Sequence, residues 1–155
     1  MLELYKKGVN IFDLPQDNEA VCVTTNGIVK KDGCAVMGAG IAKQADQLFN
    51  LSPKLGEYLT KYGNRAFRLG RWKRTDGNIF TIFSFPTKHD WRNDSDVTLI
   101  CKSAEQLMAM CDKWNIQKCY LTPPGCGCGK LNYENTVKPW ISEILDDRFV
   151  VVFNK

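Results

Sequence analysis

Apolar and polar positions along the chain follow two different periods, and the two kinds of segment alternate. Short apolar or alternating segments, typical of β-strands, cover residues 2–5, 20–25, 78–85, 118–122 and 149–153. The segment at 78–85 is the strongest, because β-branched and aromatic residues fill most of its positions. The segment at 149–153 is apolar at every position, which is typical of a strand buried on both faces of a sheet.

Three segments between the strands carry apolar residues at helical spacing. The apolar side chains recur every three or four positions, which predicts helices over residues 41–49, 55–62 and 97–114. Pro53 is well placed to open the second of these helices. Ser95 or Asp96 can cap the third with a side-chain oxygen.

A last helix is predicted after Asn132, which can act as its N-cap. Pro139 follows within this segment, so the helix either kinks there or begins its regular part at that proline. Strands that alternate with helices predict an α/β layered fold with a mostly parallel sheet. We expect residues 1–155 to form one domain, because no repeat, low-complexity tract or linker divides them.

Two glycine-rich loops lie where a strand segment ends or a helix begins. The first, Gly33-Cys-Ala-Val-Met-Gly-Ala-Gly40, runs directly into a predicted helix, and the second, Pro123-Pro-Gly-Cys-Gly-Cys-Gly129, follows the strand at 118–122. Bare backbone N–H groups in such loops, together with the positive end of a helix, bind phosphate groups. Two loops of this kind indicate a ligand with two phosphates, or one long ligand held at two places.

Ligands of open parallel sheets bind beyond the carboxyl ends of the strands. Both glycine loops are expected at that edge of the sheet. Asn26 directly follows the second strand, and residues 86–90 follow the strand at 78–85. Four segments that are distant in sequence are therefore predicted to meet at one site.

Charge and cysteine content narrow the class of protein. The net charge is +4 and the basic residues are scattered, which favours an anionic ligand without predicting a dedicated nucleic-acid surface. Seven cysteines are an odd number, and several lie in apolar segments, so we expect free thiols in a reducing cytoplasm. The first residues carry an acid and two lysines instead of a signal peptide, and no apolar segment reaches membrane-spanning length.

Two common nucleotide-binding motifs do not match the glycine loops. A P-loop requires a glycine five residues before Gly129-Lys130, where Pro124 stands, and a Ser or Thr after the lysine, where Leu131 stands. The dinucleotide fingerprint requires a third glycine at the position of Lys43. An ATPase and a dinucleotide-binding dehydrogenase are therefore both disfavoured.

Three motifs, in this order, resemble the macrodomain family, whose members bind ADP-ribose and its derivatives. They are Val36-Met-Gly-Ala-Gly-Ile-Ala42, Phe85-Pro-Thr-Lys-His-Asp-Trp-Arg92 and Pro123-Pro-Gly-Cys-Gly-Cys-Gly-Lys-Leu-Asn-Tyr133. The resemblance covers nearly the whole chain. It is strongest to the branch that includes the bacterial DNA ADP-ribosyl glycohydrolase antitoxin and the human terminal ADP-ribose protein glycohydrolase. It implies a three-layer α/β/α fold with a mixed, mostly parallel central sheet.

The resemblance also implies roles for individual positions. Asn26 would bond the distal ribose and take part in catalysis, and an N-terminal turn would hold the adenine. Two loops would bind the diphosphate. The implied adenine turn is Asn10, Ile11 and Phe12, and the implied loops are Met37, Gly38, Ala39, Gly40 and Ile41, and Gly125, Cys126, Gly127, Cys128 and Gly129. Asn10 stands where many members have aspartate, and its carboxamide oxygen can still accept a hydrogen bond from the adenine amino group.

Lys88 is the second catalytic residue that the resemblance implies. A lysine aimed at the anomeric carbon could form a covalent adduct with the opened sugar, or stabilise charge as the glycosidic bond breaks. The human-type enzyme has aspartate at the position of Gly129, so its lysine–aspartate pair is absent from this chain. Asp90 and Asp32 are candidate bases that match no motif position.

The resemblance predicts an ADP-ribosyl hydrolase that removes ADP-ribose from a modified protein or nucleic acid. Two alternatives stay open, namely an ADP-ribose 1''-phosphate phosphatase and a non-catalytic reader of ADP-ribosylated targets. The expected partner is ADP-ribose or an ADP-ribosylated macromolecule, with at most weak contact with nucleic acid and none with a membrane. No cofactor is expected. The expected location is the cytoplasm, or the host cytoplasm for a viral protein.

Functional roles could also be assigned to the cysteines, to His89 and to Trp91, but the sequence around these residues disfavours such roles. Cys126 and Cys128, even with Cys34, lack the paired spacing of a structural zinc site, so no metal is expected. His89, the only histidine, is expected to face solvent, and Trp91 to seal the edge of the core. The modified group would lie against variable loops, among which we place residues 68–76.

Overall fold

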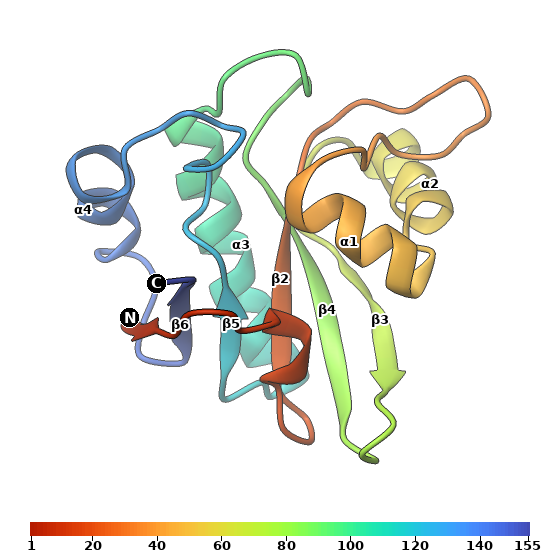
Figure 1. Ribbon diagram of the computed structural model, residues 1–155. Helices are drawn as coiled ribbons and strands as arrows, with labels where there is room; N and C mark the ends of the chain where they lie inside the picture. Colours follow the sequence, from red (N-terminus) through yellow and green to blue (C-terminus); the bar gives the residue numbers. More distant parts are fainter.

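The computed structural model describes residues 1–155 and consists of a six-stranded sheet between two layers of helices (Figure 1). The strand order is β1-β6-β5-β2-β4-β3; the first five strands in this order are parallel, and β3 runs antiparallel to β4. The predicted α/β fold with a mixed, mostly parallel sheet is confirmed. The strands are β1 (Leu2–Tyr5), β2 (Ala20–Thr25), β3 (Arg68–Lys73), β4 (Ile79–Pro86), β5 (Cys119–Leu121) and β6 (Phe149–Phe153).

Helices α1 and α2 cover one face of the sheet, and α3 and α4 cover the other (Figure 1). A 3-10 turn at Ile11–Asp13 follows β1. The side chain of Asp96, one of the two expected caps, accepts the Thr98 N–H at the start of α3. The helices are α1 (Gly40–Phe49), α2 (Ser52–Tyr62), α3 (Val97–Trp114) and α4 (Lys138–Ile141).

The last helical segment differs in detail from the prediction. Asn132 is a cap as expected, and its side chain accepts the Asn135 N–H at 2.8 Å. The turn that it caps is a π-helical turn, Tyr133–Val137, and α4 begins directly after it. Pro139 is the second residue of α4, where its missing N–H breaks no intrahelical hydrogen bond.

Strand β2 is buried on both faces, which explains its apolar run. Ala20 and Cys22 pack into the cluster under α3 and α4, whereas Val21 and Val23 pack into the cluster under α1 and α2. Successive side chains of a strand point to opposite faces of the sheet. A strand with a core on each side therefore has no polar face to show in the sequence.

Strand β3 was not predicted, and the expectation that residues 68–76 form a variable loop is wrong for most of that segment. β3 is the edge strand beside β4, and Leu69 is its one fully buried side chain. Arg71 and Lys73 are exposed there, where charged side chains discourage pairing with another chain. Gly70, with a φ of 146°, lies at an irregularity in the β3–β4 pairing.

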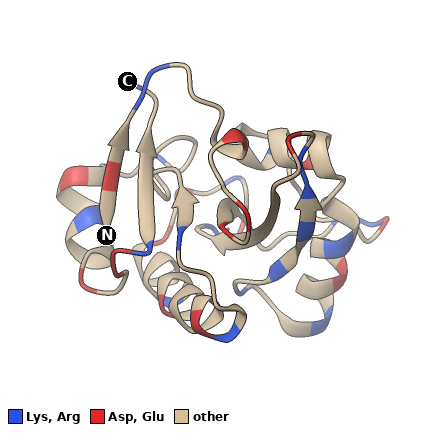
Figure 2. Ribbon diagram, turned by 90° about the horizontal axis from the view of Figure 1, so that it is seen from below, with Lys and Arg blue, Asp and Glu red and all other residues tan.

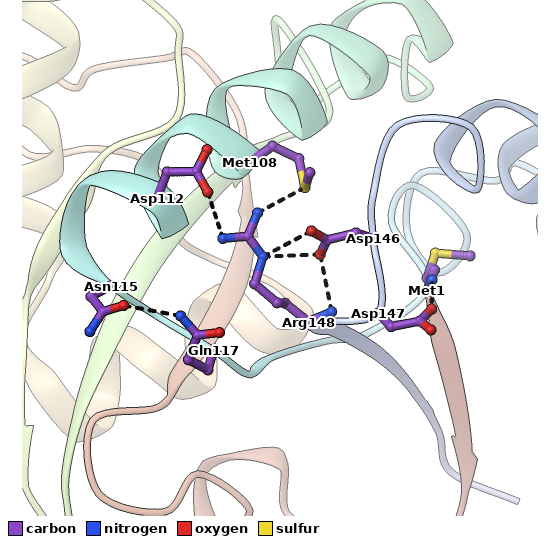
Figure 3. A network of polar contacts seen from close by, with 8 residues as sticks. All are labelled: Met1, Met108, Asp112, Asn115, Gln117, Asp146, Asp147 and Arg148. Carbon is purple, nitrogen blue, oxygen red and sulfur yellow. Dashed lines mark hydrogen bonds and ion pairs between the residues drawn. The ribbon is translucent and has the colours of Figure 1, made fainter.

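Arg148 links the end of α3 to the turn before β6 (Figure 3). Its guanidinium donates to Asp112 of α3 at 2.8 Å and to Asp146 at 3.0 Å, and its side chain is only 16% exposed. Next to it, the amino group of Met1 pairs with Asp147 at 2.7 Å. These contacts hold the N-terminus to the turn before β6, and this turn to α3.

Charged side chains are spread over many elements. Lys and Arg segments lie among Asp and Glu segments on several helices, strands and loops (Figure 2). No helix combines the length and the hydropathy that crossing a bilayer requires.

Candidate functional site

A cleft of about 780 Å³ opens at the carboxyl ends of β2, β4 and β5. The connections that leave these three strands all rise at the same end of the sheet (Figure 1). The structure thereby brings together the four segments that the sequence analysis singled out. The lining consists of residues 24–26, 36–42, 87–88, 91, 95, 122–123 and 125–129.

The first glycine loop presents the start of α1 to the cleft. Gly40, the first residue of α1, has a φ of 57°, a conformation that side chains other than glycine rarely adopt. The N-cap residue, Ala39, offers no side-chain oxygen to the helix. The N–H groups of the first turn therefore have no side-chain partner and can bind an anion.

The second glycine loop is held against the segment that precedes α3. Gly129 accepts the Ser95 N–H at 3.0 Å, and Gly125 accepts the Leu131 N–H at 2.9 Å. A Cβ at position 129 would fall on the Ser95 hydroxyl and on the Gly125 carbonyl. This loop can therefore keep its path only with glycine at position 129.

Lys88 reaches the second glycine loop from the end of β4. Its ammonium donates to the Cys128 carbonyl at 3.1 Å and to the Trp91 carbonyl at 3.5 Å, and its side chain is half-buried. An ammonium has three N–H donors, so one remains for a ligand in the cleft. Lys88 thus contributes an ammonium group to the same cleft that the first glycine loop lines.

Asn26 is held rigidly beside the first glycine loop. Its Nδ2 donates to the Val36 carbonyl at 3.0 Å, and its Oδ1 accepts the Ile28 N–H at 3.0 Å. A carboxamide has two N–H donors, so the second one is left for a ligand. Asn26 has two roles in the structure: its side chain holds the turn after β2, and it lines the cleft.

The proposed adenine turn lies outside the cleft lining. Asn10 is exposed, and its Oδ1 already accepts the Phe12 N–H at 3.0 Å and the Gln44 amide at 3.3 Å. The side chains of Ile11 and Phe12 are buried in the core under α1 and α2. The adenine role of these three residues stays a prediction.

The structure adds hydroxyl groups that were not predicted as site residues. Thr25, Thr87 and Ser95 line the cleft, and the Thr25 and Ser95 oxygens are buried without a hydrogen-bond partner. Thr87 lies within the motif at residues 85–92 and Ser95 is a candidate cap of the helix at 97–114, but neither pattern assigns its hydroxyl to a ligand. Their place in the cleft depends on the paths of the surrounding loops.

Trp91 is the clearest wrong expectation at the site. Its side chain is 52% exposed and lines the cleft, instead of sealing the core. Trp91 lies in the loop between β4 and α3, and its backbone carbonyl accepts the Lys88 ammonium at 3.5 Å. An apolar side chain in a surface loop follows the path of that loop, which the sequence pattern did not contain.

The acidic candidates for a general base are engaged elsewhere. Hydrogen bonds from Arg92 lower the pKa of Asp90 to about 2, and the Cys34 N–H lowers the pKa of the exposed Asp32. His89 is 65% exposed, as expected, and pairs with Asp96 at 2.8 Å. Neither aspartate lines the cleft.

Cys126, in the second glycine loop, is half-buried. Burial raises the pKa of Cys126 to about 11, and its thiol donates to the Pro124 carbonyl at 3.3 Å. A thiol in this state is a poor nucleophile at neutral pH. No three His, Cys, Asp or Glu side chains are grouped so that they could hold a metal ion.

Comparisons with known proteins complete this description. No protein-family model matches the sequence, and no curated protein matches it. Thermosipho africanus DarTG in complex with ADP-ribose is similar, with a TM-score of 0.75 and 19% identity over 93% of this chain. This chain spans only 39% of that Thermosipho chain.

Two further solved structures are similar over their whole length. The macrodomain of Thermus aquaticus DarG has a TM-score of 0.72 and 24% identity, with 99% of each chain covered. The macrodomain of Mycobacterium tuberculosis DarG has a TM-score of 0.69 and 27% identity, with 97% of each chain covered. The chain therefore has the macrodomain fold, and its structural neighbours are macrodomains.

Proposed function

We propose that this protein binds ADP-ribose in the cleft and hydrolyses an ADP-ribosyl linkage on a modified protein or nucleic acid. The observation that carries the proposal is that Lys88 and Asn26 line the same cleft as both glycine loops. The similar Thermosipho structure was obtained in complex with ADP-ribose, which supports the choice of ligand.

Different groups of the cleft lining would bind different parts of ADP-ribose. N–H groups of the two glycine loops bind the diphosphate, because backbone donors and a helix N-terminus favour anions. This anchoring places the distal ribose between Asn26 and Lys88. The free N–H of Asn26 orients a ribose hydroxyl, and the Lys88 ammonium stabilises negative charge that develops on the leaving group.

The test compares three substrates and matched variants. The parent protein is incubated with ADP-ribosylated DNA, ADP-ribosylated protein and ADP-ribose 1''-phosphate, and ADP-ribose affinity is measured by calorimetry. We expect Lys88→Ala to lower kcat about 100-fold or more, with ADP-ribose affinity changed only a few-fold, because the charge acts mainly in the transition state. Asn26→Ala should lower both kcat and affinity.

Lys118→Ala is the matched control, since Lys118 is a half-buried lysine that precedes β5 at the opposite end of the sheet. Its kinetics should equal those of the parent. Tight binding without turnover of any substrate would identify a reader instead of an enzyme. Phosphate release that Lys88→Ala leaves unchanged would identify a phosphatase and remove the role of Lys88. Failure to bind millimolar ADP-ribose would overturn the proposal as a whole.

A further inference from the structure

Asn64 lies behind the cleft, in the turn between α2 and β3, and no motif includes it. Its Nδ2 donates to the backbone carbonyl of Lys88 at 3.0 Å, a contact between residues 24 positions apart. Asn64 itself does not line the cleft. Any effect that it has on the site must therefore pass through other residues.

The same amide also packs against the turn that follows Asn26. A Cβ at Gly27 would lie 2.9 Å from both Cγ and Nδ2 of Asn64, closer than real Cβ contacts allow. The Gly27 N–H donates to the His89 carbonyl at 3.2 Å, directly beside this contact. Asn64 thus fills the junction between the backbone that carries Asn26 and the backbone that carries Lys88.

The polarity of Asn64 needs a reason beyond packing. Its Oδ1 is buried and has no hydrogen-bond partner, which is destabilising. An apolar side chain of the same size would fill this space without an unpaired oxygen. What only the amide contributes is the N–H group that holds the Lys88 carbonyl.

We propose that Asn64 is a positioning residue, which locks the Asn26 and Lys88 segments to each other and so fixes the distance between these two side chains across the cleft. The inference rests on the proposed function, in which both side chains act on the same sugar. Displacement of a catalytic group by about 1 Å can cost about 100-fold in rate. The one hydrogen bond that the Asn64 side chain makes goes to the Lys88 carbonyl and not to either of the glycine loops that would hold the diphosphate.

Asn64→Leu is the principal variant, because it keeps the size and removes both the donor and the unpaired oxygen. We expect kcat to fall about 10- to 100-fold while ADP-ribose affinity changes less than about threefold. Asn64→Asp keeps the shape and lacks the N–H donor, so it should show the same division between kcat and affinity. Asn78→Leu is the matched control, since Asn78 is a half-buried asparagine in the β3–β4 turn at the far end of the sheet.

A measurement without substrate makes the inference independent of activity. Amide hydrogen exchange at Gly27 reports the bond to the His89 carbonyl, and Asn64→Leu should accelerate it about tenfold or more while Asn78→Leu leaves it unchanged. Gly27→Ala should give the same kinetic effect as Asn64→Leu, and the double variant should be no worse than either single variant, because both changes break one contact.

The outcomes separate this inference from the proposed function. A parent protein that hydrolyses none of the three substrates overturns the proposed function, and exchange at Gly27 still decides whether Asn64 locks the two segments. Unchanged Gly27 exchange in both Asn64 variants overturns the inference. Equal losses of kcat and affinity in a stably folded Asn64→Leu protein would likewise overturn it, since they would show a general disturbance of the cleft.

Discussion

Neighbouring glycines of the second loop serve different physical purposes. A Cβ at Gly127 would meet no atom within 4 Å, whereas a Cβ at Gly129 would collide with the Ser95 hydroxyl and the Gly125 carbonyl. Neither position has a positive φ, so the difference between them is steric and not conformational. A change from glycine to alanine at each of these two positions therefore tests whether the loop binds the ligand in its observed conformation.

Gly129→Ala should lower ADP-ribose affinity at least about tenfold, because the loop must move away from Ser95 to admit the methyl group. Gly127→Ala should change affinity less than about threefold. Titration calorimetry with ADP-ribose measures both variants. Equal affinities for the parent and Gly129→Ala would show that the loop does not grip the ligand in this conformation.

At the scale of elements, α2 supports the first glycine loop from behind. Gly56 is buried in α2, and a Cβ there would fall on the Gly33 carbonyl and approach the Ala35 nitrogen at 2.8 Å. The helix thus packs on bare backbone at the beginning of the loop that presents α1 to the cleft. A glycine within a helix normally costs stability, and here the close approach accounts for it.

Gly56→Ala should therefore destabilise the protein, although a change from glycine to alanine within a helix usually stabilises it. In an unobstructed helix this change stabilises by about 0.5–1 kcal/mol, but we expect a loss of about 1–3 kcal/mol, because the methyl group overlaps fixed backbone. Glu57→Ala, on the exposed side of α2, is the control and should stay within about 0.5 kcal/mol of the parent. Urea denaturation measures both, and a stabilised Gly56→Ala protein would contradict the packing.

Sequence periodicity located buried elements better than edge elements. The bounds of β2 and β6 agree with the predicted segments, because a strand with a core on both faces leaves a continuous apolar run. β3 escaped prediction because Arg68, Arg71 and Lys73 interrupt its pattern, and its pairing with β4 is what makes it a strand. The π-helical turn before α4 was likewise invisible, since a π turn and an α turn share the same capping residue.

At the scale of the whole molecule, the Arg148 network joins segments that meet only in the folded chain (Figure 3). Hydrogen bonds from Arg148 lower the pKa of Asp146, and the carboxylate in turn raises the pKa of the arginine. A folded pKa below the unfolded value stabilises the protein above the unfolded pKa. This stabilisation disappears as the pH falls through the folded pKa.

Arg148→Met should lower the free energy of unfolding by about 0.5–1 kcal/mol at neutral pH, since it removes two ion pairs whose carboxylates, on Asp146 and Asp112, are partly screened by solvent. The difference from the parent should shrink as the pH falls below about 4, where Asp146 becomes protonated in the unfolded chain and then in the folded one. Thermal unfolding at several pH values measures it. Arg92→Met, which breaks a pair between residues two apart, should leave stability nearly unchanged, and a pH-independent effect of Arg148→Met would contradict the assignment.

The sequence alone determined the alternation of strands and helices, the two glycine loops and the residues that share one edge of the sheet. These features are local, because side-chain periodicity, glycine freedom and proline geometry act within a few residues. Only the tertiary structure decided the strand order, the exposure of Trp91, the absence of the Asn10 turn from the cleft lining and the contact of Asn64 with Lys88. Those features depend on which distant segments pack together. Packing between two segments produces no periodic pattern in the sequence of either segment.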